Sequence, residues 1–493
     1  MSQGKTKKPL VLAAVMLSMF MSAVEATIVS TAMPSIVSDL GGFSLYSWVF
    51  SSYLLMQVAT ILIYGKISDL IGRKPVFVVG VSIFLIGSLL CGFANSMEML
   101  ILFRFIQGFG AGAVMPIATT IVGDIYTKEE RASIQGYLSS VWGISAVLGP
   151  VLGGIFVKYV DWVYVFWMNI PLGIMAIIGV ILFLHEDVEK KKHTIDYTGS
   201  VLLVVFISAL MLVLVEGGVH WAWNSWQIIS LLLLFIVGFI LFIVQEQKAN
   251  EPMMPFHIWK YRAITISNLA SFTTGIIMMG VSSFLPAFVQ GVMEESPMIA
   301  GFTLTTMSIG WPIASAIAGK MVVKIGYRKL TVSGGFALII GSLIFVALSP
   351  AKGPVWAALG SFFIGFGLGL TTTSFIVSIQ STVGWNVRGI ATAANMFMRT
   401  LGSAVGVAFL GGILNSRLQS FINSQGLEER ITLETANSLL NEQERAQLVE
   451  STKNILQEGL TLSLNTVYWG VLIIALLTLA LVFFMPETEE KIS

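Results

Sequence analysis

The stretch GKISDLIGRK, residues 65–74, is the part of the sequence from which the fold can be worked out. Long apolar runs lie directly before and after it, near residues 45–64 and 76–95. A second, divergent copy, GKMVVKIGYRK, occupies residues 319–329 and also lies between two apolar runs. A repeat at so large a separation indicates two related halves within one chain.

The composition indicates a membrane protein. The chain has 493 residues, of which 55% are hydrophobic and 11% are charged, whereas soluble globular domains carry about 25% charged residues. Its net charge of +1 gives no indication of a nucleic-acid partner. The single cysteine, Cys91, excludes an intrachain disulfide and a multi-cysteine metal site. The four histidines lack metal-ligand spacing, so we expect no metal and no cofactor.

Fourteen apolar runs are long enough to cross a bilayer, which takes about 20 residues. The predicted fold is therefore all-α and integral to the membrane, with 14 transmembrane helices. The runs lie near 9–33, 45–64, 76–95, 98–122, 132–157, 163–184, 197–217, 226–245, 263–289, 299–318, 330–348, 354–379, 389–413 and 463–485.

Two further motifs recur along the chain and support the repeat. GFGAG at residues 108–112 returns as GFGLG at 365–369, and LGG at 152–154 returns at 410–412. In each case the second copy of the motif lies in or next to the apolar run eight places after that of the first copy. Runs 1–6 and 9–14 are therefore predicted to be two pseudo-symmetric six-helix halves, residues 1–190 and 256–493. Residues 191–255 then form an inserted pair, and 414–462 an extracellular loop of amphipathic, helical character.

Lysine and arginine residues set the predicted orientation, because cytoplasmic loops of membrane proteins are enriched in them. With the amino terminus inside, most of the 28 basic residues fall on the cytoplasmic side. We therefore expect a multi-pass protein of the inner (plasma) membrane with both termini in the cytoplasm.

Several stretches resemble one transporter family. GKISDLIGRK resembles the signature loop of the major facilitator superfamily, and RFIQGFGAG and GISAVLGPVLGG resemble its helix 4 and helix 5 motifs. VEATIVSTAMP, FWMNIPLG and RGIATAANMFMRTLGSAVG are similar to the fourteen-helix drug:proton antiporter branch, with Glu25 where aspartate is usual. The resemblance implies proton-coupled export by alternating access, with substrate bound between the two halves.

Glu25 lies within the first apolar run, where a carboxylate is costly unless it is paired, faces a cavity or takes a proton. Arg104 in the fourth run lies at a comparable depth and is its predicted partner. Relative movement of the two would change the proton affinity of the carboxyl group, and the resemblance likewise associates this arginine with proton coupling. A fixed structural ion pair is the alternative.

Two motifs are predicted to control opening and closing. By resemblance, the first loop acts as a latch, whereas its alternative role is only to set orientation; its residues are Gly65, Asp69, Gly72, Arg73 and Lys74. Small residues in the fifth run allow close helix contact, and Pro150 bends the helix, although simple packing is an alternative explanation. The residues of this antiporter motif are Gly143, Gly149, Pro150, Gly153 and Gly154.

A substrate cavity lined by aromatic, methionine and polar side chains suits varied amphipathic ligands. Arg399, near the middle of the thirteenth run, has no acidic residue at matching depth in its own half. Its role in coupling or in substrate binding stays open. The candidate cavity residues are Tyr53, Gln57, Trp142, Met279, Gln290, Trp311, Asn395 and Arg399.

The predicted function is proton-coupled efflux of amphipathic, cationic drugs or dyes by a monomer. The partners expected are the small substrate, protons and the lipid bilayer. The same proton-coupled transporter could instead carry a lipid, a peptide or a metabolite. The sequence argues against an enzyme or an ATP-driven pump, because it contains no nucleophile elbow, no zinc motif and no phosphate loop.

Overall fold

The computed structural model describes residues 6–126, 128–186, 196–217, 221–249, 256–383, 385–425 and 432–487. Within these ranges the chain is helical, apart from one isolated bridge between Gly217 and Trp221. The first group of helices, here called the first bundle, comprises α1 (Lys8–Leu40), α2 (Tyr46–Ile71), α3 (Arg73–Cys91), α4 (Met97–Ile125), α5 (Lys128–Tyr159), α6 (Tyr164–Trp167) and α7 (Asn169–Phe183).

A second group follows two intervening helices, α8 (Tyr197–Glu216) and α9 (Trp226–Lys248). This second bundle comprises α10 (Arg262–Ala287) and its π-helical end η3 (Phe288–Val292), α11 (Pro297–Ile325), α12 (Tyr327–Val346), α13 (Gly353–Thr382), α14 (Trp385–Ser424), η5 (Leu433–Ala436), α15 (Asn437–Leu440), α16 (Glu442–Gln447) and α17 (Glu450–Phe483). Helix α8 packs against α2 and α14, so it contacts both bundles. The predicted domain limits at 190 and 255 lie outside the described residues.

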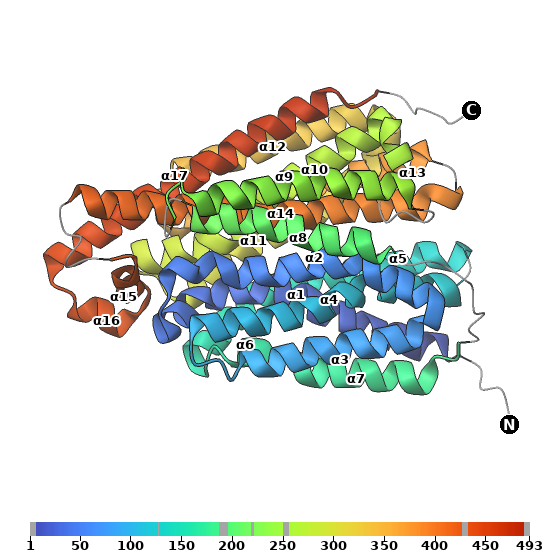
Figure 1. Ribbon diagram of the computed structural model, residues 1–493, viewed down its shortest axis with the longest axis horizontal. Helices are drawn as coiled ribbons and strands as arrows, with labels where there is room; N and C mark the ends of the chain where they lie inside the picture. The colour runs from blue at the N-terminus through green and yellow to red at the C-terminus, as the bar shows by residue number, and fades with distance from the viewer. Residues whose placement is uncertain are drawn as a thin grey trace.

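The long helices run side by side along one axis, as Figure 1 shows. The beginning of α1 and the end of α17 lie at one end of the bundle, which we call the terminal end. Helices α15 and α16 project from the opposite end, which we call the loop end. The site described below lies between these two ends.

Twelve of the described helices are long and apolar enough to cross a membrane. The two other crossings expected from the sequence correspond to α5 and α11. Helix α5 begins with the charged stretch KEER and contains only a short apolar stretch, Gly143–Tyr159. Helix α11 is rich in serine and threonine and carries two lysines. The all-helical membrane fold is thus confirmed, while the count of fourteen is not.

Two helix boundaries differ from those expected. Helix α14 continues to Ser424 and α17 begins at Glu450, so the connection is shorter than the loop predicted at 414–462. Apolar residues recur at helical spacing in the segment predicted as a loop, so α14 and α17 continue beyond their most apolar parts. The sixth run is broken into α6 and α7, because Pro171 lacks an N–H and its ring crowds the carbonyl group one turn earlier.

The sequence repeat has a counterpart in the backbone. Gly72 and Gly326, which occupy matching places in the two copies, both adopt positive φ angles, of 100° and 84°. Gly108 on α4 and Gly365 on α13 each face a carbonyl group of a neighbouring helix, α2 and α11 respectively, so closely that a Cβ atom would overlap with it. The two bundles therefore share a turn and a helix crossing.

Candidate functional site

Glu25 and Arg104 are in contact inside the first bundle. Glu25 lies on α1 and has no exposed surface, and Arg104 on α4 is 2% exposed. An Nη1 nitrogen of Arg104 donates to Oε1 of Glu25. The structure thus brings the two predicted partners together, whereas their role in proton coupling stays a prediction.

The guanidinium group of Arg104 has several further partners. Its Nε donates to the carbonyl oxygen of Val49 on α2 at 3.1 Å, and Nη1 donates to Oε1 of Gln107 at 2.6 Å. The ring of Tyr53 lies beneath it, 4.2 Å from the ring centroid. Such cation–π contact strengthens when water is excluded. Arg104 therefore connects α1, α2 and α4 through one buried side chain.

Asn169 is a further hydrogen-bond partner of Glu25, and the sequence analysis missed it. Its Nδ2 donates to Oε2 of Glu25 at 2.6 Å, and Asn169 itself is fully buried. The proline-induced break after α6 makes Asn169 the first residue of α7. Gln107 was also missed, although its position three residues after Arg104 on a helix face was a usable signal.

This arrangement balances a buried carboxylate with one cation and one amide donor. Removing one member of such a pair leaves an uncompensated charge, which costs about 3–5 kcal/mol. Gln107 is held in turn by Ser88 on α3, to which its Nε2 donates at 2.8 Å. Chemically, the site can hold one proton, on the carboxyl group of Glu25.

The loop after α2 is anchored to its own bundle. Arg73 pairs through Nε with Asp124 at 3.2 Å, and its backbone N–H donates to Glu186 at 2.7 Å. Lys74 donates to the carbonyl oxygens of Ile181 and Leu184 near the end of α7. The side chain of Asp69 lies outside the described residues, and Gly65 has open space around its Cα. The latch role of this loop remains a prediction.

The glycines of α5 differ in their surroundings. A Cβ on Gly153 would lie 2.8 Å from the carbonyl oxygen of Ile28 on α1, and one on Gly154 would lie 2.8 Å from Cα of Met298 on α11. Gly149 meets Thr27 of α1 even more closely. A Cβ on Gly143, by contrast, would meet only Pro312 at 3.7 Å. Helix α5 is thus wedged between α1 and α11 near the loop end.

Comparison with known proteins identifies the family. The Major Facilitator Superfamily profile matches residues 15–407. The chain belongs to this superfamily. "Multidrug resistance protein 3" of Bacillus subtilis (strain 168) is 36% identical over 99% of this chain and 97% of its own length. "Multidrug transporter protein MdtP" of the same organism is 37% identical over 84% of this chain and 77% of its own length.

Solved structures show the same fold. A bacterial homologue of the human lysosomal transporter Spinster, in an inward-facing and occupied conformation, superposes with a TM-score of 0.66. The match covers 97% of this chain and 96% of the other at 16% identity. This superfamily member is a transporter rather than an enzyme.

The predicted cavity residues of this superfamily member fall into two sets. Tyr53, Met279, Gln290 and Asn395 are at least 95% buried. Gln290 donates to the carbonyl oxygen of Thr31 on α1 at 3.2 Å, so it joins the two bundles at the loop end. Partly exposed side chains are better placed to meet a substrate, and the side chain of Trp142 lies outside the described residues. The partly exposed candidates are Gln57, Trp311 and Arg399.

Further contacts close the loop end. Tyr46 on α2 donates to the carbonyl oxygen of Ser283 on α10 at 2.7 Å. Glu434 in η5 accepts hydrogen bonds from the backbone N–H groups of Gly42 and Phe43, at 2.8 and 3.1 Å. We call these contacts, together with Gln290–Thr31, the loop-end gate. The sequence analysis missed Glu434, which lies in a polar segment without a local motif.

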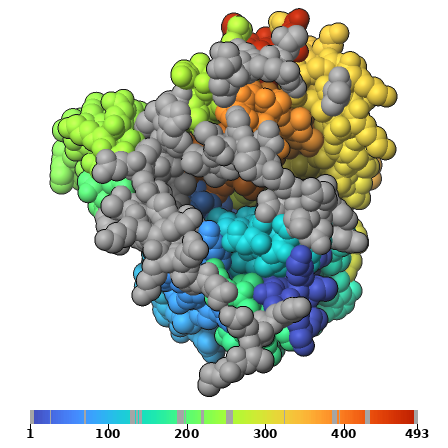
Figure 2. Space-filling view, turned by 90° about the vertical axis from the view of Figure 1, so that its right-hand side faces the viewer, coloured from blue at the N-terminus to red at the C-terminus, as the bar shows by residue number. Residues whose placement is uncertain are grey.

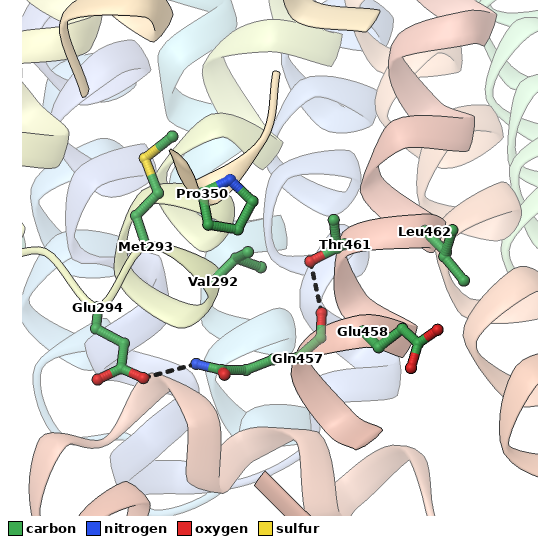
Figure 3. Close-up of a pocket in the computed structure, with 8 residues that line it drawn as sticks. All are labelled: Val292, Met293, Glu294, Pro350, Gln457, Glu458, Thr461 and Leu462. Atoms are coloured by element: carbon green, nitrogen blue, oxygen red, sulfur yellow. Dashed lines mark hydrogen bonds between the residues drawn. The ribbon is translucent and has the colours of Figure 1, made fainter. Parts of the chain in front are cut away.

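The pocket in Figure 3 lies at the loop end of the second bundle and has a volume of about 460 Å³. Glu294 and Gln457 lie side by side at its edge, and Nε2 of Gln457 donates to Oε1 of Glu294 at 2.8 Å. Glu294 also pairs with Lys453 at 2.6 Å. The pocket contains none of the predicted cavity residues, so it is separate from the substrate path predicted from the sequence.

Proposed function

We propose that this protein exports amphipathic drugs in exchange for protons, as a monomer, by alternating access between its two bundles. In this proposal α1–α7 and α10–α17 are the two six-helix halves, and α8 and α9 are the inserted pair. The names of the Bacillus relatives support drug efflux, since the first of them matches over almost the full chain. The terminal end would face the cytoplasm of a cell whose plasma membrane holds the protein.

The buried Glu25–Arg104–Asn169 cluster is the observation that carries the proposal. An ionised Glu25 is neutralised by Arg104 and held by Asn169. A proton on the carboxyl group would cancel its charge, weaken the pair and leave the guanidinium group to Gln107, Val49 and the ring of Tyr53. The protonated and ionised states therefore favour different positions of α1 relative to α4.

Helices α1 and α2 could transmit this change to the loop-end gate. Thr31, which accepts from Gln290, lies six residues after Glu25 on α1, a rise of about 9 Å. Tyr46, which donates to Ser283, lies one turn before Val49 on α2. A shift of either helix at the buried cluster would therefore move a contact of the loop-end gate. Protonation of Glu25 would in this way be coupled to opening of the gate.

The charge of the cargo is a separate part of the proposal. The predicted preference for cations rests on the acid at Glu25, which is fully buried in the described conformation. A cationic drug could use this carboxylate only after Arg104 has moved away. We therefore propose amphipathic cargo in general, with cations as the class that would compete directly with the proton.

A transport assay tests the proposal. Inverted membrane vesicles receive an imposed pH gradient, and uptake of a fluorescent lipophilic cation is compared between the wild type and Glu25→Gln. We expect the variant to bind the dye but to lose gradient-driven transport, while Glu442→Gln, an exposed change on α16, transports normally. Unchanged transport by Glu25→Gln, or transport that survives a protonophore, would contradict proton coupling at this residue.

A further inference from the structure

Arg399 on α14 is a cation that the described part of the protein leaves unbalanced. Its side chain lies deep within the helix bundle, yet part of its surface remains accessible. It therefore faces an internal space rather than lipid. Its guanidinium group makes no hydrogen bond or ion pair with the described residues, whereas its backbone carbonyl accepts from Ser403.

The contrast with Arg104 shows what is missing at Arg399. Arg104 is paired with a carboxylate, a carbonyl oxygen and an amide oxygen, and it lies over an aromatic ring. A guanidinium group has five N–H donors and no acceptor, and charged groups at membrane depth are normally paired or meet water. Within the described part of the chain, Arg399 has the donors of Arg104 without any of these partners.

Two of the helices packed on α14 offer no acid to Arg399. Helices α10 and α13 contain no aspartate or glutamate along their whole length. Glu25 in the first bundle is already neutralised by Arg104. Among the described residues, no ion pair therefore balances the charge of Arg399.

A buried polar cluster that begins one turn before Arg399 on α14 contains a further donor without a described partner. One turn before Arg399, Asn395 donates through Nδ2 to Asn268 on α10 at 3.1 Å and to Ser271 at 2.8 Å. The Nδ2 group of Asn268 is fully buried and has no hydrogen-bond partner in the described part of the chain. Both unsatisfied groups thus require an acceptor, which favours an anionic ligand over a cation.

Arg399 lies on the terminal side of the loop-end gate. Gly411, twelve residues later on α14, packs against Ser47 of α2 where the two bundles meet, and this separation corresponds to about 18 Å. Viewed from the terminal end in Figure 2, the surface is recessed between the orange residues of the second bundle and the blue and cyan residues of the first. A ligand at Arg399 would thus approach from the cytoplasmic side of the proposed exporter.

We propose that Arg399 binds an anionic group of the transported molecule, so that the cargo includes amphiphiles with a carboxylate or sulfonate. This inference rests on the proposed export function and specifies its substrate class. The planar fork of the guanidinium group matches the two oxygens of a carboxylate. A zwitterionic drug can place its anionic group against this guanidinium group.

Equilibrium binding to the purified full-length transporter tests this assignment without any pH gradient. The probes are a rhodamine with a free carboxylate and its methyl ester, which differ only in the anionic group. We expect Arg399→Gln to weaken binding of the acid about tenfold or more, in line with loss of a charged hydrogen bond, and to leave binding of the ester nearly unchanged. Arg399→Lys should retain part of the preference, and Arg417→Gln, an exposed charge change on the same helix, should retain all of it.

Other outcomes would overturn the assignment. Equal loss of both dyes in Arg399→Gln would make the side chain structural, and no loss of either would remove it from the substrate path. Displacement of both dyes by inorganic sulfate or by phosphatidylglycerol, dependent on Arg399, would identify a free anion or a lipid headgroup as the ligand instead. Failure of the proposed function is seen separately, as absence of gradient-driven transport in the vesicle assay.

Discussion

Gln290 donates from its side chain to the carbonyl oxygen of Thr31, 3.2 Å away, and so joins the π-helical end of α10 to α1. Thr31 lies on the same helix as Glu25. The buried acid and a contact between the bundles therefore belong to one rigid element. In the proposed mechanism, a proton at Glu25 would act on the gate through α1 without any longer chain of contacts.

Asn169 should be needed for transport. Replacing it with leucine removes the amide that donates to Glu25 at 2.6 Å, so the ionised carboxylate loses one of its stabilising partners. We expect Asn169→Leu to keep drug binding and to lower gradient-driven transport about tenfold, a change of about 1.4 kcal/mol. Asn423→Leu, on the exposed end of α14, should transport like the wild type, and equal activities of the two variants would exclude a role for Asn169.

Arg104 and Glu25 should be coupled in stability. Arg104→Gln leaves a buried carboxylate without its cation, which should destabilise the protein by about 3–5 kcal/mol. The double variant Glu25→Gln/Arg104→Gln should regain most of this loss, because no buried charge then remains. Thermal unfolding of all four proteins in detergent measures the coupling. Simple additivity of the two single changes would show that the contact does not contribute to stability.

Much of the helical membrane fold could be predicted from the sequence, because apolar runs and the GKISDLIGRK repeat are local patterns. The depth of Glu25 and Arg104 along their runs indicated their pairing, and the structure has them in contact. Asn169 could not be found in this way, since its position depends on how α7 packs against α1. Glu434 lies 392 residues from Gly42, and no local pattern predicts so distant a contact. The exposure of Arg399 likewise depends on tertiary packing.

Close packing of α5 on α11 should be essential for closing the loop end. A Cβ on Gly301 of α11 would overlap with the carbonyl oxygen of Pro150 on α5. Gly301→Val should therefore hold the two helices apart and abolish transport while leaving the protein folded. Gly319→Val, on the same helix, serves as the control, because no heavy atom lies within 4 Å of the Cβ it would add. Transport by Gly301→Val at the wild-type rate would show that this contact is dispensable.

Glu434 should hold the loop-end gate closed. Its carboxylate accepts from the N–H groups of Gly42 and Phe43 and from the hydroxyl of Ser44. Because Glu434 is exposed, solvent screening keeps the contribution of these contacts to about 1 kcal/mol. We expect Glu434→Gln to increase opening at this end.

A cysteine reporter at the buried gate residue Ser283 makes this measurable. In a Cys91→Ala background the reporter is the sole thiol, and its reaction with a maleimide from the loop side reports opening. Labelling should become several-fold faster in Glu434→Gln and stay unchanged in Glu442→Gln on the neighbouring helix α16. Equal labelling in both variants would place Glu434 outside the gate.

Glu294 should give the loop end a pH-dependent stability. The ammonium group of Lys453, which donates to it at 2.6 Å, holds the pKa of Glu294 below its usual value of 4.5. A carboxyl group whose pKa is lowered by folding stabilises the protein fully above that usual value, and the contribution is lost as the pH falls through the lowered pKa. Glu294→Gln should therefore lower the thermal midpoint at neutral pH but have a diminishing effect below about pH 4.5. Because Glu294 is 38% exposed, solvent screening should keep the difference below about 1 kcal/mol. Glu458→Gln, in the same pocket, is the control, and a constant difference across this pH range would show that the ion pair does not contribute.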